Sequence, residues 1–209
     1  MKRLHGLYVI TDTRLIPDAQ LNAAVEQAIA GGARVVQYRD KRDDASHRHV
    51  QAEALANLCR ARGTVFIIND DPALAAAVRA DGVHLGRDDG DIAAARALLG
   101  PDAVIGVSCY NQLERAQAAA AAGADYVAFG SFFPSSVKPN AVRAVPELLR
   151  EAKAHLPVPL AAIGGITSAN GAALIAAGAD LLAVISDVFG HDDVRAAAQR
   201  IAQLFPKYT

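Results

Sequence analysis

A short phrase joining the end of a helix to the start of a strand recurs along this chain and limits the folds open to it. Clear copies are Ala30–Val36, Ala122–Val127 and Ala177–Leu182, and looser copies are Ala61–Val65 and Arg79–Val83. Each has alanine-rich sequence, a glycine suited to the left-handed residue that ends a helix, and then an apolar run. The spacing of roughly 20 to 30 residues is that of a βα unit.

Eight strands follow from this repeat, mostly as the short apolar runs typical of parallel strands buried on both faces. They are predicted at Leu7–Thr11, Ala33–Arg39, Thr64–Ile68, Gly82–Leu85, Ala103–Val107, Tyr126–Gly130, Leu160–Ile163 and Leu181–Ile185. Helices are predicted near 18–31, 44–62, 72–80, 91–99, 112–122, 141–155, 168–177 and 191–204. Asp71-Pro72 has the pattern of an N-cap and first helical residue, and Asn111–Glu114 that of a capping box variant.

Eight βα units in 209 residues predict an α/β fold, a compact (β/α)8 TIM barrel forming a single domain over residues 1–209. The alternative is an open doubly wound sheet, but residues 12–17 after the first strand lack the glycine-rich fingerprint of that fold. Barrel enzymes place their active sites at the carboxyl ends of the strands, so the polar residues at those ends are the candidates.

A cationic row follows the second strand. Gln37, Arg39 and Lys41 share one face because strand side chains alternate, whereas Asp40 points to the other face. Such a row requires a counter-charge, and two interpretations are open. It is either a solvated strand end with ion pairs to its neighbours, or a site for an anion such as a diphosphate. Arginine can grip such an anion in a fork, and lysine can bind it as a point charge.

Polar residues also follow the third and fourth strands. If Asp71 caps the next helix, Asn69 and Asp70 are left to face the barrel mouth, and Asp89 lies in the following loop. Two carboxylates from adjacent loops suit Mg²⁺, which typically keeps waters and bridges to phosphate. An N-cap is the alternative role for Asp89, but the neighbouring cations favour a Mg²⁺–diphosphate site.

The later strand ends carry weaker signals. Ser108 follows strand five, and the long loop 130–139 after strand six has two hydroxyls and Lys138, which indicates a functional loop rather than a proline-rich connector. Gly165 belongs to a glycine pair after strand seven, and Ser186 follows strand eight. Barrels often bind a phosphate between these last two loops.

Composition excludes several classes of protein. A net charge of −1 and the absence of a basic patch argue against nucleic acid, and the chain has no apolar run long enough for a membrane span. Cys59 and Cys109 lie far apart, and the N-terminus has no apolar leader, so a cytoplasmic location is expected. His84 lies inside a predicted strand and is expected to be a hydrogen-bonded core residue. A homo-oligomer is compatible with the sequence.

In its motifs the chain resembles the thiamine phosphate synthase family, over essentially its whole length. The matching segments are Tyr8–Asp12, Gln37–Lys41, Asn69-Asp70, His84-Leu85-Gly86 with Asp89, Gly106–Ser108, Phe133-Pro134-Ser135 with Lys138, and Ile163–Ile166. The resemblance implies a transferase that joins an aminopyrimidine, hydroxymethylpyrimidine (HMP) diphosphate, to a thiazole phosphate. The products are thiamine phosphate and diphosphate.

The resemblance also implies a role for each matching residue. The pyrimidine diphosphate would be contacted by Gln37, Arg39, Lys41, Asn69, Ser108 and Lys138. The leaving group is stabilised by Mg²⁺ and by Arg39, Lys41 and Lys138, and Mg²⁺ is held by Asp70 and Asp89. The thiazole phosphate would be bound by Ser135, Val137, Gly165, Ile185 and Ser186, mostly through backbone groups.

One departure concerns Val137, which stands where the family often has a threonine, so that only a backbone N–H remains there. Three other functions were weighed. A thiazole tautomerase-like isomerase needs no diphosphate site, a module that only binds thiamine precursors would leave the leaving-group residues unexplained, and a sugar-phosphate epimerase would lack the row formed by Gln37, Arg39 and Lys41.

Overall fold

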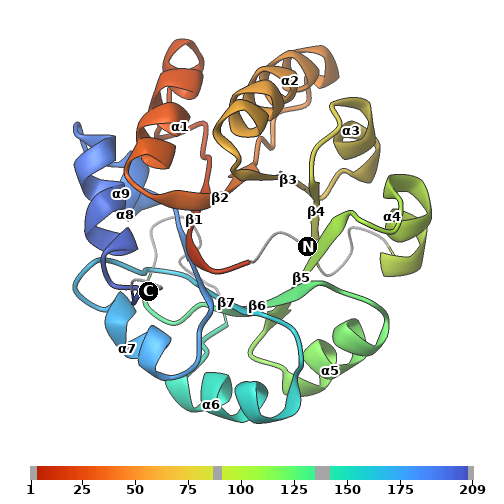
Figure 1. The fold of residues 1–209 in the computed structure, drawn as a ribbon, viewed down its shortest axis with the longest axis vertical. Helices are drawn as coiled ribbons and strands as arrows, with labels where there is room; N and C mark the ends of the chain where they lie inside the picture. The colour runs from red at the N-terminus through yellow and green to blue at the C-terminus, as the bar shows by residue number, and fades with distance from the viewer. Residues whose placement is uncertain (1–3, 87–90, 135–141, 207–209) are drawn as a thin grey trace.

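Eight parallel strands close into a barrel in the order of the sequence, and Figure 1 looks along it with the helices around the outside. The computed structural model describes residues 4–86, 91–134 and 142–206. The strands are β1 (Gly6–Ile10), β2 (Ala33–Tyr38), β3 (Val65–Asn69), β4 (Gly82–Leu85), β5 (Val104–Tyr110), β6 (Tyr126–Gly130), β7 (Leu160–Ile163) and β8 (Leu181–Val184). The predicted (β/α)8 barrel is therefore confirmed, and the open sheet is excluded.

Helices alternate with the strands as the repeat predicts. They are the short 3-10 helix η1 (Asp18–Gln20), α1 (Leu21–Ala30), α2 (Ala45–Arg62), α3 (Pro72–Ala77), α4 (Ile92–Leu99), α5 (Leu113–Ala121), α6 (Pro146–His155), α7 (Gly171–Ala176), α8 (Ser186–Phe189) and α9 (Val194–Ala202). Asp71 is the N-cap of α3, accepting a hydrogen bond from the Leu74 N–H at 2.8 Å, with Pro72 in the first turn, as predicted. Each helix of the described residues is too short or too polar to cross a membrane.

One predicted helix start and one predicted helix cap were wrong. The helix predicted over 141–155 begins only at Pro146, because Val142 and Ala144 are instead held by backbone hydrogen bonds to Ser131. Gln112 is the N-cap residue of α5, but within the described chain its side chain makes no capping hydrogen bond, so the capping box variant is not formed.

The helix predicted over 191–204 is preceded by a separate turn of helix. The short α8 begins at Ser186, directly after β8, and was missed by the sequence analysis. The following α9 starts afresh at Val194, with Asp193 as its N-cap. The Asp193 side chain accepts a hydrogen bond from the Ala196 N–H at 2.9 Å.

The core has two layers, separated by the sheet. Alternate strand residues such as Leu7 and Val9 point outward and pack under the helices. Their neighbours Tyr8 and Ile10 point inward and fill the barrel together with Val35 and other residues. This alternation is the one predicted for the second strand, where Gln37 shares the inward face with Val35.

Several strand ends and one glycine differ from the prediction. β3 runs on to Asn69, and β5 runs to Tyr110 with a register shift against β6 between Ser108 and Tyr110, so Ser108 lies within β5 and not after it. In the segment Arg79–Val83, Gly82 does not take the left-handed conformation that the repeat predicts for its glycine. Arg79 takes that conformation with φ 54°, and Gly82 is a glycine because a Cβ there would overlap the Val104 carbonyl group of the neighbouring strand.

Candidate active site

The carboxyl ends of the strands surround a cavity of about 150 Å³. Residues from all eight strands or the loops that follow them line it. Among the predicted site residues, the lining includes Gln37, Arg39, Asn69, Ser108, Gly165, Ile185 and Ser186. The structure thus brings together residues from sequence positions 37 to 186 that were assigned to two different substrates.

The cationic row after β2 already has counter-charges within the protein. The Lys41 ammonium forms an ion pair with Asp70 at the end of β3, and a guanidinium nitrogen of Arg39 lies 3.9 Å from a carboxylate oxygen of Asp12. Gln37 is 2 % exposed and donates its amide to the Tyr8 hydroxyl at 2.6 Å. The structure therefore contains the ion pairs that the first interpretation expects. Arg39 also lines the cavity, where the second interpretation expects an anion.

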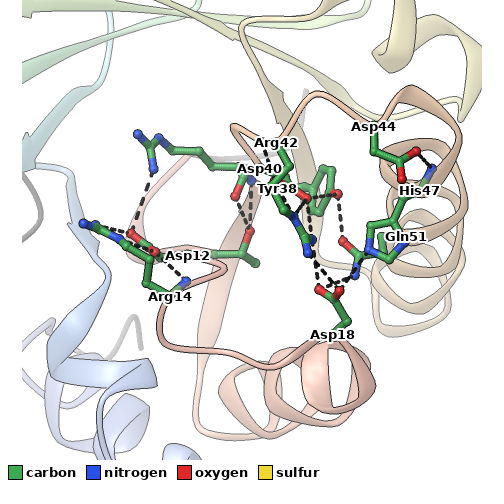
Figure 2. A network of polar contacts seen from close by, with 11 residues as sticks. Asp12, Arg14, Asp18, Tyr38, Asp40, Arg42, Asp44, His47 and Gln51 are labelled. Atoms are coloured by element: carbon green, nitrogen blue, oxygen red, sulfur yellow. Dashed lines mark hydrogen bonds and ion pairs between the residues drawn. The ribbon is translucent and has the colours of Figure 1, made fainter.

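Asp12, which the sequence analysis did not assign, connects the loops after β1 and β2 (Figure 2). Its buried carboxylate accepts two hydrogen bonds from the Arg14 side chain, at 2.7 and 3.0 Å. Hydrogen bonding by Arg14 is the main cause that holds the pKa of Asp12 below its usual range. Because Arg14 takes up most of this acceptor capacity, Arg39 is paired only loosely with Asp12, at 3.9 Å, and it also lines the cavity.

Asp40 points away from the cavity, as the alternation predicts, into a polar network between β2 and α2 (Figure 2). Arg42 bridges this fully buried carboxylate to Asp18 in η1, with three side-chain hydrogen bonds to Asp40 and two to Asp18. The Tyr38 hydroxyl donates to Gln51 of α2 at 2.9 Å. The network therefore holds the β2 end, which carries Arg39, against the first two helices.

Asp70 is the predicted metal ligand that the structure describes. It lies directly after β3 with φ 63°, and its carboxylate Oδ2 accepts from Asn69 at 2.6 Å and from Lys41. Asp89, the second predicted ligand, lies outside the described residues. Its alternative role as a helix cap is filled by Asp91, whose side chain accepts a hydrogen bond from the Ala94 N–H and caps α4.

The described residues contain no cluster of three or more His, Cys, Asp or Glu side chains arranged for a metal ion. The Asp70 carboxylate nevertheless offers the hard oxygen ligand that Mg²⁺ takes, and Mg²⁺ commonly binds through one or two carboxylates with phosphate and water. The carboxylate of Asp70 therefore has the ligand chemistry that Mg²⁺ requires.

The loops after β7 and β8 form the opposite side of the cavity. Gly164 and Gly165 have φ values of 102° and 63°, and a Cβ on Gly165 would overlap the Pro134 carbonyl oxygen. The glycine pair is thus required by close packing against the loop after β6, which the sequence analysis did not foresee. Ser135, Val137 and Lys138, predicted in that loop, lie outside the described residues.

Two side chains that sequence reasoning missed fix the backbone of the β7 loop. Asn170 accepts from the Thr167 N–H at 2.8 Å and donates to the Gly165 carbonyl at 3.0 Å. Asp187 of α8 accepts from the Ser168 N–H at 3.0 Å. The loop that was expected to bind phosphate through its backbone is therefore held in one conformation before any ligand arrives.

His84 is a hydrogen-bonded core residue, as expected. Its two ring nitrogens lie 2.9 Å from the Tyr126 hydroxyl and 2.9 Å from the Ser108 hydroxyl. The sequence analysis missed the two tyrosines that continue this chain, Tyr8 and Tyr126, because an aromatic residue in an apolar strand has the pattern of ordinary core. The one available signal was that Tyr8 shares the inward face of β1 with residues lining the mouth.

A closed barrel with a cavity at the carboxyl ends of its strands, lined in part by polar side chains, places this protein in the class of (β/α)8-barrel enzymes. The sequence profile of the family described as thiamine monophosphate synthase matches residues 7–188. The chain belongs to this family.

Similar proteins agree over nearly the full length. The thiamine-phosphate synthase of Azoarcus sp. (strain BH72) is 56% identical over 204 residues, covering 98% of this chain and 98% of that one. That of Thiobacillus denitrificans is 55% identical over 201 residues, covering 96% and 94%. The solved thiamine phosphate pyrophosphorylase from Pyrococcus furiosus superposes with a TM-score of 0.88 at 36% identity, covering 97% of this chain and 96% of that one. These comparisons do not favour the tautomerase-like or binding-only alternatives.

Proposed function

We propose that this chain is a thiamine-phosphate synthase, which joins HMP diphosphate to thiazole phosphate and releases diphosphate. One observation carries the proposal: residues assigned to the two substrates line a single cavity. Gln37, Arg39 and Asn69 contribute from one side, and Gly165 and Ser186 contribute from the other. Two phosphorylated molecules held in one cavity can react without a covalent enzyme intermediate.

The reaction forms one carbon–nitrogen bond and breaks one carbon–oxygen bond. The thiazole nitrogen supplies the electron pair to the methylene carbon of the pyrimidine, and the bonding pair of the C–O bond leaves with diphosphate. The pyrimidine ring stabilises positive charge at that carbon, so departure of the anion can lead. The protein then has to stabilise the charge of the leaving diphosphate and position the nucleophile.

Arg39, Lys41 and Lys138 are the residues proposed to stabilise the leaving group. Arg39 lines the cavity and is only loosely paired with Asp12 at 3.9 Å, which supports an anion-binding role. Lys41 is 59% exposed and forms an ion pair with Asp70, so an incoming diphosphate can compete for its ammonium group. Lys138 is proposed from the sequence alone.

Mg²⁺ is the proposed metal, held by Asp70 and, from the sequence, by Asp89. When bound, it would supply positive charge to the leaving diphosphate. The position of Asp70, at the end of the strand next to the one carrying Arg39, supports this assignment. A cytoplasmic location and a homo-oligomer remain predictions from the sequence.

The proposed reaction needs no general base from the protein, because the thiazole nitrogen carries its own lone pair. This agrees with His84, whose two ring nitrogens are both engaged within the barrel. The phosphate of the thiazole substrate is assigned to the backbone of Gly165 and to Ile185 and Ser186 at the start of α8, with Ser135 and Val137 proposed from the sequence.

The test is to incubate the purified chain with both substrates and Mg²⁺. We expect thiamine phosphate and diphosphate in equal amounts, and no product when either substrate is left out. Arg39→Met is the informative variant, since it removes the charge beside the cavity and keeps an apolar side chain of similar length. Absence of product from the wild-type chain, or full activity of Arg39→Met, would contradict the proposal.

A further inference from the structure

Five polar side chains form a continuous chain of hydrogen bonds through the barrel interior. In order they are Gln37 of β2, Tyr8 of β1, Tyr126 of β6, His84 of β4 and Ser108 of β5, joined at 2.6, 2.8, 2.9 and 2.9 Å. The first four are between 0 and 8% exposed. All except Tyr126 line the cavity. Tyr126 is thus an interior link that can affect a ligand only through its neighbours.

The barrel makes specific room for this link. A Cβ on Gly106 of β5 would overlap the ring of Tyr126 at Cζ and Cε1, so the ring packs directly on the backbone of the neighbouring strand. The rings of Tyr8 and Tyr126 meet edge to face, with centroids 6.0 Å apart. This arrangement explains a glycine whose backbone angles would accept any residue, since Gly106 is not among the glycines with positive φ.

The amide donor at Gln37 implies one direction for the whole chain, because the distances by themselves assign no donor in the other three hydrogen bonds. Gln37 donates its amide to Tyr8, so the Tyr8 hydroxyl proton goes to its other partner, Tyr126. Tyr126 then donates its single proton to His84 Nδ1, which requires the neutral imidazole to carry its proton on Nε2. In this direction His84 Nε2, which lies 2.9 Å from the Ser108 hydroxyl, would donate to it, and the Ser108 proton would be left for another acceptor.

Stability alone does not account for this chain. The rest of the interior layer is apolar, with Val35, Val65 and Ile67 among its members, and burying hydroxyl and imidazole groups carries a desolvation cost that their hydrogen bonds only offset. Burial raises the pKa values of the Tyr8 and Tyr126 phenols well above the usual range, so both remain proton donors at any working pH. A fully satisfied buried network of this kind fixes side-chain positions and proton directions.

We propose that Tyr8, Tyr126 and His84 are positioning residues that set the hydrogen-bond direction of the cavity floor. They make Ser108 a donor toward the bound ligand, and they leave the carboxamide oxygen of Gln37 as an acceptor. The identity of that ligand rests on the proposed function. An aminopyrimidine offers the complementary pair, a ring nitrogen that accepts and an exocyclic amino group that donates.

The direction of the chain can be tested without substrate or activity. Nitrogen-15 NMR of the wild-type protein, with His84→Gln used to assign the signal, is expected to show His84 as the neutral tautomer protonated on Nε2. Tyr126→Phe removes the donor to Nδ1 and should shift the Nδ1 resonance, while Tyr38→Phe removes a buried phenol on the outer face of the sheet and should not. A His84 protonated on Nδ1, or an unchanged signal in Tyr126→Phe, would overturn the proposal.

The consequence for catalysis is tested by a double-mutant cycle. Tyr126→Phe should lower kcat/KM for HMP diphosphate about tenfold, as expected for one misdirected hydrogen bond, and leave the KM for thiazole phosphate unchanged. In a Ser108→Ala background most of this loss should disappear, because the effect passes through Ser108. Tyr38→Phe should have the same effect with and without Ser108→Ala.

Gly106→Ala gives a second way to break the chain, since it displaces the Tyr126 ring without removing a polar group. Gly106→Ala should lower kcat/KM for HMP diphosphate by the same factor as Tyr126→Phe. Combining the two substitutions should cause no further loss. If Tyr126→Phe loses the same factor in the Ser108→Ala background, or raises both KM values alike, the residue is merely structural and the proposal fails. If wild-type enzyme forms no thiamine phosphate, the proposed function fails, and the NMR result still decides the direction of the chain.

Discussion

Arg42 offers the sharpest test of the packing around the active-site strand β2. Its guanidinium is 42% exposed, yet it is the cation that pairs with the Asp40 carboxylate, which is 0% exposed. Three side-chain hydrogen bonds of 2.7 to 3.0 Å join the two residues, and two more of 2.9 Å reach the half-exposed Asp18 (Figure 2). Arg42→Met keeps the apolar stem and removes only the charge and the donors.

The expected loss of unfolding free energy in Arg42→Met comes almost entirely from its ion pair with the buried Asp40 carboxylate. Removing one partner of a buried ion pair leaves an uncompensated charge and costs about 3 kcal/mol, whereas exposed pairs contribute little. For a chain of this length, about 3 kcal/mol corresponds to a melting temperature lower by roughly 6 to 12 °C. Asp18→Asn, which disrupts only the exposed half, should cause a clearly smaller loss.

The destabilisation caused by Arg42→Met should depend on pH in a direction set by the pKa of Asp40. Burial raises the pKa of Asp40, but the hydrogen bonds and charge of Arg42 outweigh burial, so the folded pKa lies below its usual value. The wild-type pair therefore stabilises the fold above the unfolded pKa of about 4, and this contribution is lost as the pH falls through the folded value. In Arg42→Met, burial is unopposed, the folded pKa of Asp40 rises, and the cost is relieved as the pH falls.

Urea unfolding followed by circular dichroism between about pH 4 and pH 7 measures the difference in unfolding free energy between wild type and Arg42→Met. We expect the difference to be largest near pH 7 and to shrink toward pH 4. The double variant Arg42→Met with Asp40→Asn should recover part of the loss, because no buried charge remains. A difference that is constant across this pH range would refute the reasoning.

Three further outcomes are expected. Asp70→Ala and Lys138→Ala should each lower the coupling rate about 100-fold or more while the melting temperature stays near wild type, and steady-state kinetics with thermal melts would check this. Chelation of divalent metal should abolish turnover, and added Mg²⁺ should restore it in a diphosphate-release assay. Gly165→Ala should raise the KM for thiazole phosphate and destabilise the protein by about 1 to 3 kcal/mol, because its Cβ overlaps the Pro134 carbonyl oxygen and its φ is 63°. An unchanged KM in that variant would argue against a backbone phosphate site at this loop.

The fold could be predicted from the sequence because its signals are local. Each βα unit carries its own helix end and apolar strand, and eight such units leave few ways to bury every strand on both faces. Local signals failed where a distant contact decides the structure. Gly82 is fixed by the Val104 carbonyl group on the next strand. The start of α6 is set by two backbone hydrogen bonds, from the Ser131 N–H to the Val142 carbonyl and from the Ala144 N–H to the Ser131 carbonyl.

The gathering of candidate residues at one end of the barrel was also predictable from the sequence. Gln37, Arg39 and Asn69 follow from the rule that strand ends meet at one rim, and the structure brings them to one cavity. The hydrogen bond between Tyr8 and Tyr126 joins residues 118 positions apart and depends on barrel closure, so no local pattern could indicate it. Asp12 was missed for a related reason, since its role depends on the register of β1 against β2.

The central claim is that one cavity at the carboxyl ends of the strands holds both substrates at once. A crystal structure of the protein with thiamine phosphate, diphosphate and Mg²⁺ tests it most directly. We predict diphosphate and the metal beside Arg39 and Asp70, and the phosphate of thiamine phosphate against the backbone of Gly165 and Ser186. Products bound at separate places on the surface, or a cavity that stays closed to them, would contradict the account.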